Sequence, residues 1–134
     1  MTLLKSTQIL LNIVNFNNFV MPKMITLGSE LIRINPAKNT IEYSTNGGRF
    51  WVSRCTSSSY GTFVDLLPFG NELIAITSKG VYASTNKGSF WVSRCTSSSY
   101  GEFLSLTDGG KEILAQTSKG LYYSTNGGRF WVRR

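Results

Sequence analysis

The chain has 134 residues, a net charge of +7 and no histidine. Its apolar fraction of 41% and aromatic fraction of 13% exclude a disordered tail, and its charged fraction of 16% argues against coiled coils and long solvated helices. A basic chain attracts polyanions such as nucleic acid, acidic glycans and anionic membranes, although ordinary surface charge explains the same balance. The length fits one small domain with a real core.

We interpret residues 1–15 as an N-terminal arm that forms a strand or docks on a partner. Lys5 precedes an apolar stretch from Ile9 to Val14, which Asn12 interrupts. No window reaches the ~18 apolar residues of a membrane span, and no small-residue cleavage site follows the arm. We therefore expect neither a secretion signal nor a transmembrane segment, and the compartment stays open.

The rest of the chain is predicted to be three repeated units, over 16–55, 56–95 and 96–134. The segment from Phe50 to Gly61 recurs unchanged from Phe90 to Gly101, and a third copy begins at Phe130. In the second unit we expect four short strands, over 62–67, 72–77, 81–84 and 90–95. Four strands per ~40–45 residues is the spacing of a propeller blade. The sequence therefore predicts an all-β fold of three four-stranded blades with almost no helix.

The segment that ends at each tryptophan resembles the Asp-box, or BNR repeat, S-x-D-x-G-x-x-W, with Asn in the place of Asp. The matching residues are Ser44, Asn46, Gly48 and Trp51, then Ser84, Asn86, Gly88 and Trp91, then Ser124, Asn126, Gly128 and Trp131. This box recurs in sialidases, sorting-receptor propellers and propellers of the photosystem assembly-factor type. The resemblance implies a propeller fold in which the box is a structural turn and not an active site.

Simple chemistry explains why a tight turn needs these residues. Ser and Asn oxygens can accept hydrogen bonds from backbone groups two residues further on, Gly permits a positive φ, and Trp covers the turn with a large apolar face. Asn carries no charge, which weakens any case for a metal, since hard cations prefer carboxylates. We expect no metal and no cofactor.

Three blades form an arc, and closed propellers have roughly four to eight blades. Because we expect each blade to present the same lateral faces, a copy from another chain should fit as well as one from the same chain. Two chains would then complete a six-bladed homodimeric ring. A larger assembly with a foreign partner and an isolated open half-ring are the alternatives.

Little in the sequence indicates catalysis. Without histidine the chain has no default general base or zinc ligand. Cys55 and Cys95 occupy the same position in neighbouring units, too far apart for a disulfide, and we expect both to be buried. Asp65 and Asp108 lack the arginine cluster and Tyr–Glu pair that a sialidase-like site needs. We therefore expect a protein that is not an enzyme.

Three repeated sets remain as candidate ligand-binding residues: Arg54, Arg94 and Arg134; Lys79 and Lys119; Tyr60 and Tyr100. The basic sets would form a girdle that holds an acidic polymer, and the hydroxyl-rich loops before the tyrosines suit glycans. Solvated charges and ordinary loop connections explain the same residues. The functions considered are a structural or interaction module in a phage or bacterial surface assembly, a lectin of the small multi-chain propeller type, and an inactive glycosidase remnant.

Overall fold

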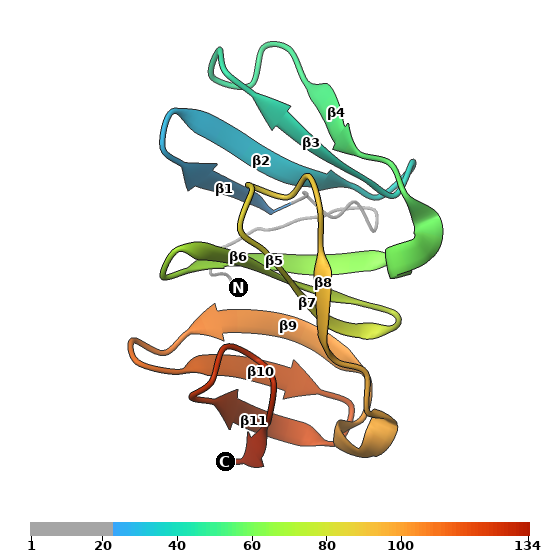
Figure 1. The fold of residues 1–134 in the computed structure, drawn as a ribbon, viewed down its shortest axis with the longest axis vertical. Helices are drawn as coiled ribbons and strands as arrows, with labels where there is room; N and C mark the ends of the chain where they lie inside the picture. Colours follow the sequence, from blue (N-terminus) through green and yellow to red (C-terminus); the bar gives the residue numbers. More distant parts are fainter. Residues whose placement is uncertain (1–22) are drawn as a thin grey trace, which may run out of the picture.

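The computed structural model describes residues 23–134, so the predicted arm over 1–15 lies outside the described residues. The described chain forms three four-stranded antiparallel sheets, which follow one another along the long axis of the molecule (Figure 1). Each sheet is built in chain order, strand beside strand, as the repeat predicts for a blade. The all-β prediction of three four-stranded blades is confirmed.

The second and third strands have nearly the same lengths in all three blades, whereas the first and fourth strands vary. The first blade contains β1 (Met24–Leu27), β2 (Glu30–Asn35), β3 (Thr40–Ser44) and β4 (Val52–Cys55). The second contains β5 (Phe63–Phe69), β6 (Glu72–Thr77), β7 (Gly80–Ser84) and β8 (Val92–Cys95). The third contains β9 (Phe103–Asp108), β10 (Ile113–Thr117), β11 (Gly120–Ser124) and β12 (Val132–Arg133).

Two short 3₁₀ turns, Ser58–Tyr60 and Ser98–Tyr100, are the helical elements of the described residues. Each links one blade to the next, and in each a serine hydroxyl accepts from the backbone N–H two residues on. None of the described helices is both long and apolar enough to cross a membrane.

The second strand of the second blade, β6, is buried on both faces, as its continuous apolar run predicts. The outer strand β8 begins two residues later than predicted. The N–H of Phe90 is used inside the preceding turn, where it donates to the side chain of Asn86, and pairing with β7 begins only after it.

The core lies between the blades. One cluster joins the first blade to the second and includes Ile41, Cys55 and Trp91. The other joins the second blade to the third and includes Val81, Cys95 and Trp131. Both cysteines are buried and unpaired, as expected. Because each cluster is shared by two sheets, a blade buries its apolar surface only against a neighbouring blade.

Polar contacts also cross from one blade to the next. The carboxylate of Asp65 on β5 accepts from the backbone N–H of Leu106 on β9 at 2.8 Å. The side chain of Asn39, in the β2–β3 turn, accepts from the N–H of Phe63 at 2.8 Å and donates to the carbonyl of Gly61 at 3.0 Å. These bonds fix the position of each inner strand against its neighbour.

Candidate functional site

The three turns between the third and fourth strands of each blade share one hydrogen-bond pattern. In the second blade, Ser84 Oγ accepts from the N–H of Gly88 at 2.9 Å, and its hydroxyl donates to Asn86 Oδ1 at 2.7 Å. The same Asn86 oxygen accepts from the N–H of Phe90 at 3.0 Å. Ser44, Asn46 and Gly48 make the same bonds in the first blade, as do Ser124, Asn126 and Gly128 in the third. The neutral amide is therefore sufficient to hold the turn.

The tryptophans of these turns differ in burial. Trp91 and Trp131 are buried against the preceding blade, whereas Trp51 is only partly buried. The guanidinium of Arg33 stacks on the Trp51 ring, 3.9 Å from its centroid. A neighbouring blade covers the rings of Trp91 and Trp131, whereas the cation that covers the Trp51 ring comes from the same blade.

The repeated arginines pair with the repeated glutamates. Arg54 on β4 makes a two-pronged ion pair with Glu30 at the start of β2, at 2.7 and 2.9 Å. Arg94 makes the same two-pronged pair with Glu72, whereas Arg134 contacts a single oxygen of Glu112. Two-pronged guanidinium–carboxylate pairs fix geometry as well as charge, so the pairs of the first two blades join the outer strand of each blade firmly to its second strand.

The arginines also reach the next blade. Arg54 donates to the carbonyl of Lys87 at 3.3 Å, and Arg94 donates to the carbonyl of Gly127 at 2.8 Å. Both acceptors lie in the Ser–Asn turn of the following blade. The Arg134 side chain is 46% exposed, against 13% and 9% for Arg54 and Arg94, and among residues 23–134 no following turn reaches it.

Each blade has a forward face, and in the first two blades the next blade covers it. Its residues are Ile32, Ile34 and Ile41 in the first blade, Ile74, Ile76 and Val81 in the second, and Leu114, Gln116 and Leu121 in the third. The first two sets are buried, whereas Gln116 and Leu121 are exposed. Val81 is 0% exposed and its counterpart Leu121 is 38% exposed.

Each blade also has a backward face, and in the second and third blades the preceding blade covers it. Its residues are Leu66, Ala75, Tyr82 and Trp91 in the second blade, Leu106, Ala115, Tyr122 and Trp131 in the third, and Met24, Arg33, Glu42 and Trp51 in the first. In the first blade the Arg33–Glu42 ion pair replaces alanine and tyrosine. In the part of the chain that the structure describes, no blade covers the backward face of the first blade or the forward face of the third, and both faces are more polar than their counterparts. The prediction that every blade presents the same lateral faces is therefore wrong for these two.

The predicted lysines and tyrosines hold the links between blades. Lys79 Nζ donates to the carbonyl of Ser59 at 3.1 Å, and Lys119 Nζ donates to that of Ser99 at 3.3 Å. The Tyr60 hydroxyl accepts from the N–H of Trp91, and its ring packs edge-on against Tyr82. Tyr100 makes the same contacts with Trp131 and Tyr122. The structure thus brings each lysine to its own serine-rich loop.

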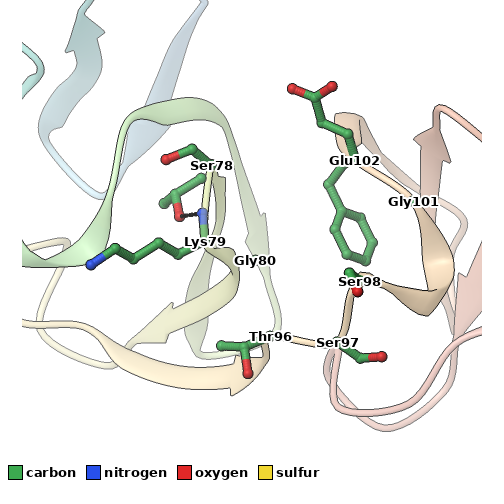
Figure 2. Close-up of a pocket in the computed structure, with 10 residues that line it drawn as sticks. Ser78, Lys79, Gly80, Thr96, Ser97, Ser98, Gly101 and Glu102 are labelled. Atoms are coloured by element: carbon green, nitrogen blue, oxygen red, sulfur yellow. Dashed lines mark hydrogen bonds between the residues drawn. The ribbon is translucent and has the colours of Figure 1, made fainter.

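A pocket of about 350 Å³ lies between the β6–β7 turn of the second blade and the link to the third. Figure 2 shows Ser78, Lys79 and Gly80 on one side, Ser98, Gly101 and Glu102 on the other, and Thr96 and Ser97 along the link below them. The side chain of Lys79 points away from Glu102. Five hydroxyl-bearing residues line the pocket together with Phe103, so it offers both hydrogen-bonding groups and an apolar surface to a ligand.

The ion pairs shift the pKa of their carboxyls. The hydrogen bond from Arg54 holds the pKa of Glu30 below its ordinary value, and Arg94 does the same for Glu72. Burial raises the pKa of Glu42, but hydrogen bonds from Asn35 and Arg33 outweigh it and the net pKa is lowered. All three carboxylates stay charged at neutral pH.

The pairing of arginine with glutamate was not predicted, although the sequence carries a signal for it. Both sets recur in phase along the chain, and they have opposite charges. The two charges are 24 residues apart in the first blade and 22 apart in the second and third. Opposite charges that recur together in this way are a pairing signal, because equivalent positions of a repeat tend to make equivalent contacts.

Comparison with known proteins gives matches in structure. No protein-family profile matches the chain, and no curated protein matches it by sequence. YCF48 from Cyanidioschyzon merolae superposes with a TM-score of 0.61 at 21% identity, over 84% of this chain and 40% of that chain. A structure of YCF48 bound to D1 peptide gives 0.62 at 15% identity, over 86% and 44%. An ancestral GH74 enzyme gives 0.59 at 22% identity, over 82% and 18%.

The chain therefore spans less than half the length of the solved structures named here. At these identities the similarity concerns the fold and not the activity. Together with the three four-stranded sheets, it shows that the chain has a β-propeller fold.

Proposed function

We propose that the chain is a non-enzymatic β-propeller module for protein–protein interaction that self-assembles into a closed ring. The observation that carries this proposal is the state of the two end faces. A neighbouring blade contacts Val81, Trp91 and Arg94. Within the described residues, no neighbouring blade contacts their counterparts, which are Leu121, Trp51 and Arg134. Exposed apolar groups on a face that elsewhere forms a core favour association.

Two chains would bring six blades together, within the usual range for a closed ring. A ring built this way presents each repeated surface in two-fold symmetry, which suits a scaffold in a phage or bacterial surface assembly. The peptide bound to the similar YCF48 supports, for this fold, a role in engaging other polypeptides.

Solution mass tests the proposal directly. We expect light scattering and native mass spectrometry at micromolar concentration to give about twice the chain mass of 14.9 kDa. A mass of 14.9 kDa under these conditions would contradict self-assembly, and the open faces would then belong to a different partner.

The hydroxyl-rich pocket supports a second candidate function, that of a carbohydrate-binding lectin. Ser97 and Ser98 line it beside Thr96, and Lys79 stands at its rim. A glycan array tests this with Ser98→Val, which removes a hydroxyl from the pocket while leaving the Tyr100 packing in place. Loss of a glycan signal in that variant would support the lectin; an array with no signal for the unaltered chain would remove it.

A further inference from the structure

The two contacts between described blades follow one rule. The side chain of Ile41 lies against Gly88, where an added Cβ would sit 3.3 Å from it, and Val81 lies against Gly128 at 2.9 Å by the same measure. Beside each of these contacts an arginine of the earlier blade donates to a carbonyl of the later turn, that of Lys87 or Gly127. We call this set of contacts between two blades a joint. In each joint an apolar side chain of the earlier blade packs on a glycine of the later one, and a guanidinium of the earlier blade donates to a carbonyl of the later one.

The third blade carries the forward half of this joint, and the first blade carries the backward half. Leu121 and Arg134 stand where Val81 and Arg94 stand one blade earlier. On the first blade, the nearest described side chains to a Cβ added at Gly48 are Trp51 and Leu31, both of the same blade.

The polar changes on the two open faces match each other. Gln116 on the forward face of the third blade stands in the place of Ile76, which shares a core cluster with Ala115 and Tyr122. The counterparts of those two residues on the first blade are Arg33 and Glu42. An amide can accept from a guanidinium and donate to a carboxylate, so Gln116 is suited to lie opposite an ion pair.

We infer that a second copy of this chain docks head to tail, with its first blade on the forward face of the third blade. In this register Leu121 packs on Gly48 of the second copy, Arg134 donates to the carbonyl of Gly47, and Gln116 faces the Arg33–Glu42 pair. The inference rests on the proposed self-assembly and specifies which faces meet.

Two lysine variants and a matched control test the register. Leu121→Lys changes the forward face, and Met24→Lys changes the backward face, where Met24 is 53% exposed and its counterpart Leu66 is 1% exposed. Leu104→Lys is the control, because Leu104 is 46% exposed and its counterpart Val64 is still 44% exposed between two covering blades. Circular dichroism and thermal melting check folding, and Leu121→Gln repeats the forward-face test with a milder change.

Native mass spectrometry reads the outcome. We expect each face variant alone to be monomeric, the control to remain dimeric, and an equal mixture of the two face variants to form heterodimers at least tenfold above either homodimer. The mixture regains dimers because both substitutions fall in the same interface of the heterodimer. Its other head-to-tail interface is formed by the two unaltered faces. A dimeric Leu121→Lys variant, or a mixture that stays monomeric, would overturn the register. If the unaltered chain is dimeric in the same experiment, the proposed self-assembly still holds. A monomeric unaltered chain overturns both.

Discussion

The second and third blades share most of their residues, but their forward faces have different surroundings. In the second blade Ile74, Ile76 and Val81 are buried, because the third blade lies on them. In the third blade Leu114, Gln116 and Leu121 occupy the same strand positions and are open to different degrees. Burial in this fold is therefore a property of the joint between two blades and not of a single blade.

The largest expected effect comes from truncating the same position in both blades. Ile74→Ala removes a fully buried side chain, and such changes cost about 2–5 kcal/mol. Leu114→Ala, at the matching and only partly buried position, should cost about 1 kcal/mol, because less apolar surface is lost. Urea unfolding of both variants below the association concentration measures the difference. Equal losses would show that burial does not depend on the neighbouring blade.

The arginine contacts give the next largest difference. Arg94→Met leaves the Glu72 carboxylate and the Gly127 carbonyl without their donor, and we expect a loss of about 1–3 kcal/mol. Arg134→Met removes a much more exposed pair, which should cost less than about 1 kcal/mol. Thermal melting of the monomeric proteins compares them. A cost for Arg134→Met as large as that for Arg94→Met would contradict the role assigned to the carbonyl contact.

Acid should weaken the covered joints through their glutamates. The pKa of Glu72 is held below its ordinary value of 4.5 by Arg94. A lowered folded-state pKa contributes stability above the unfolded value, and this contribution disappears as the pH falls through the folded value. Stability should thus decline as the pH drops below about 4.5. In Glu72→Gln the decline should be shallower, and an unchanged pH profile in denaturant titrations would argue against the pair.

The smallest expected effect is a gain in stability. Lys87 has a φ of +64°, whereas the matching positions Gly47 and Gly127 are glycines with φ of +76° and +75°. Lysine in this left-handed conformation is strained, and Lys87→Gly should raise stability by about 0.5 kcal/mol after the entropy of the unfolded glycine is included. Because Arg54 contacts the Lys87 carbonyl, the joint should be unaffected. A loss of stability would mean that the lysine side chain matters.

Most of the fold could be predicted from the sequence, because the repeat fixes both the period and the turn. Ser84, Asn86 and Gly88 are close in sequence and make their bonds locally, so pattern and chemistry identify the turn without tertiary information. The pairs of Arg54 with Glu30 and of Tyr60 with Trp91 join residues far apart in the chain. The shared recurrence of arginine and glutamate indicates that they pair, but which atoms meet, and the contact of Tyr60 with Trp91, depend on how strands and blades lie together.

The identical stretch that spans Phe50–Gly61 and Phe90–Gly101 has a consequence for how such chains can vary in length. It contains the arginine that reaches forward and the tyrosine that supports the following blade. Recombination between its two copies would delete or duplicate one whole unit, and the new joint would keep the arginine and tyrosine contacts, because both residues lie inside the identical stretch. The number of blades in the assembled ring would then change by one for each chain, and the surfaces by which chains meet would stay the same.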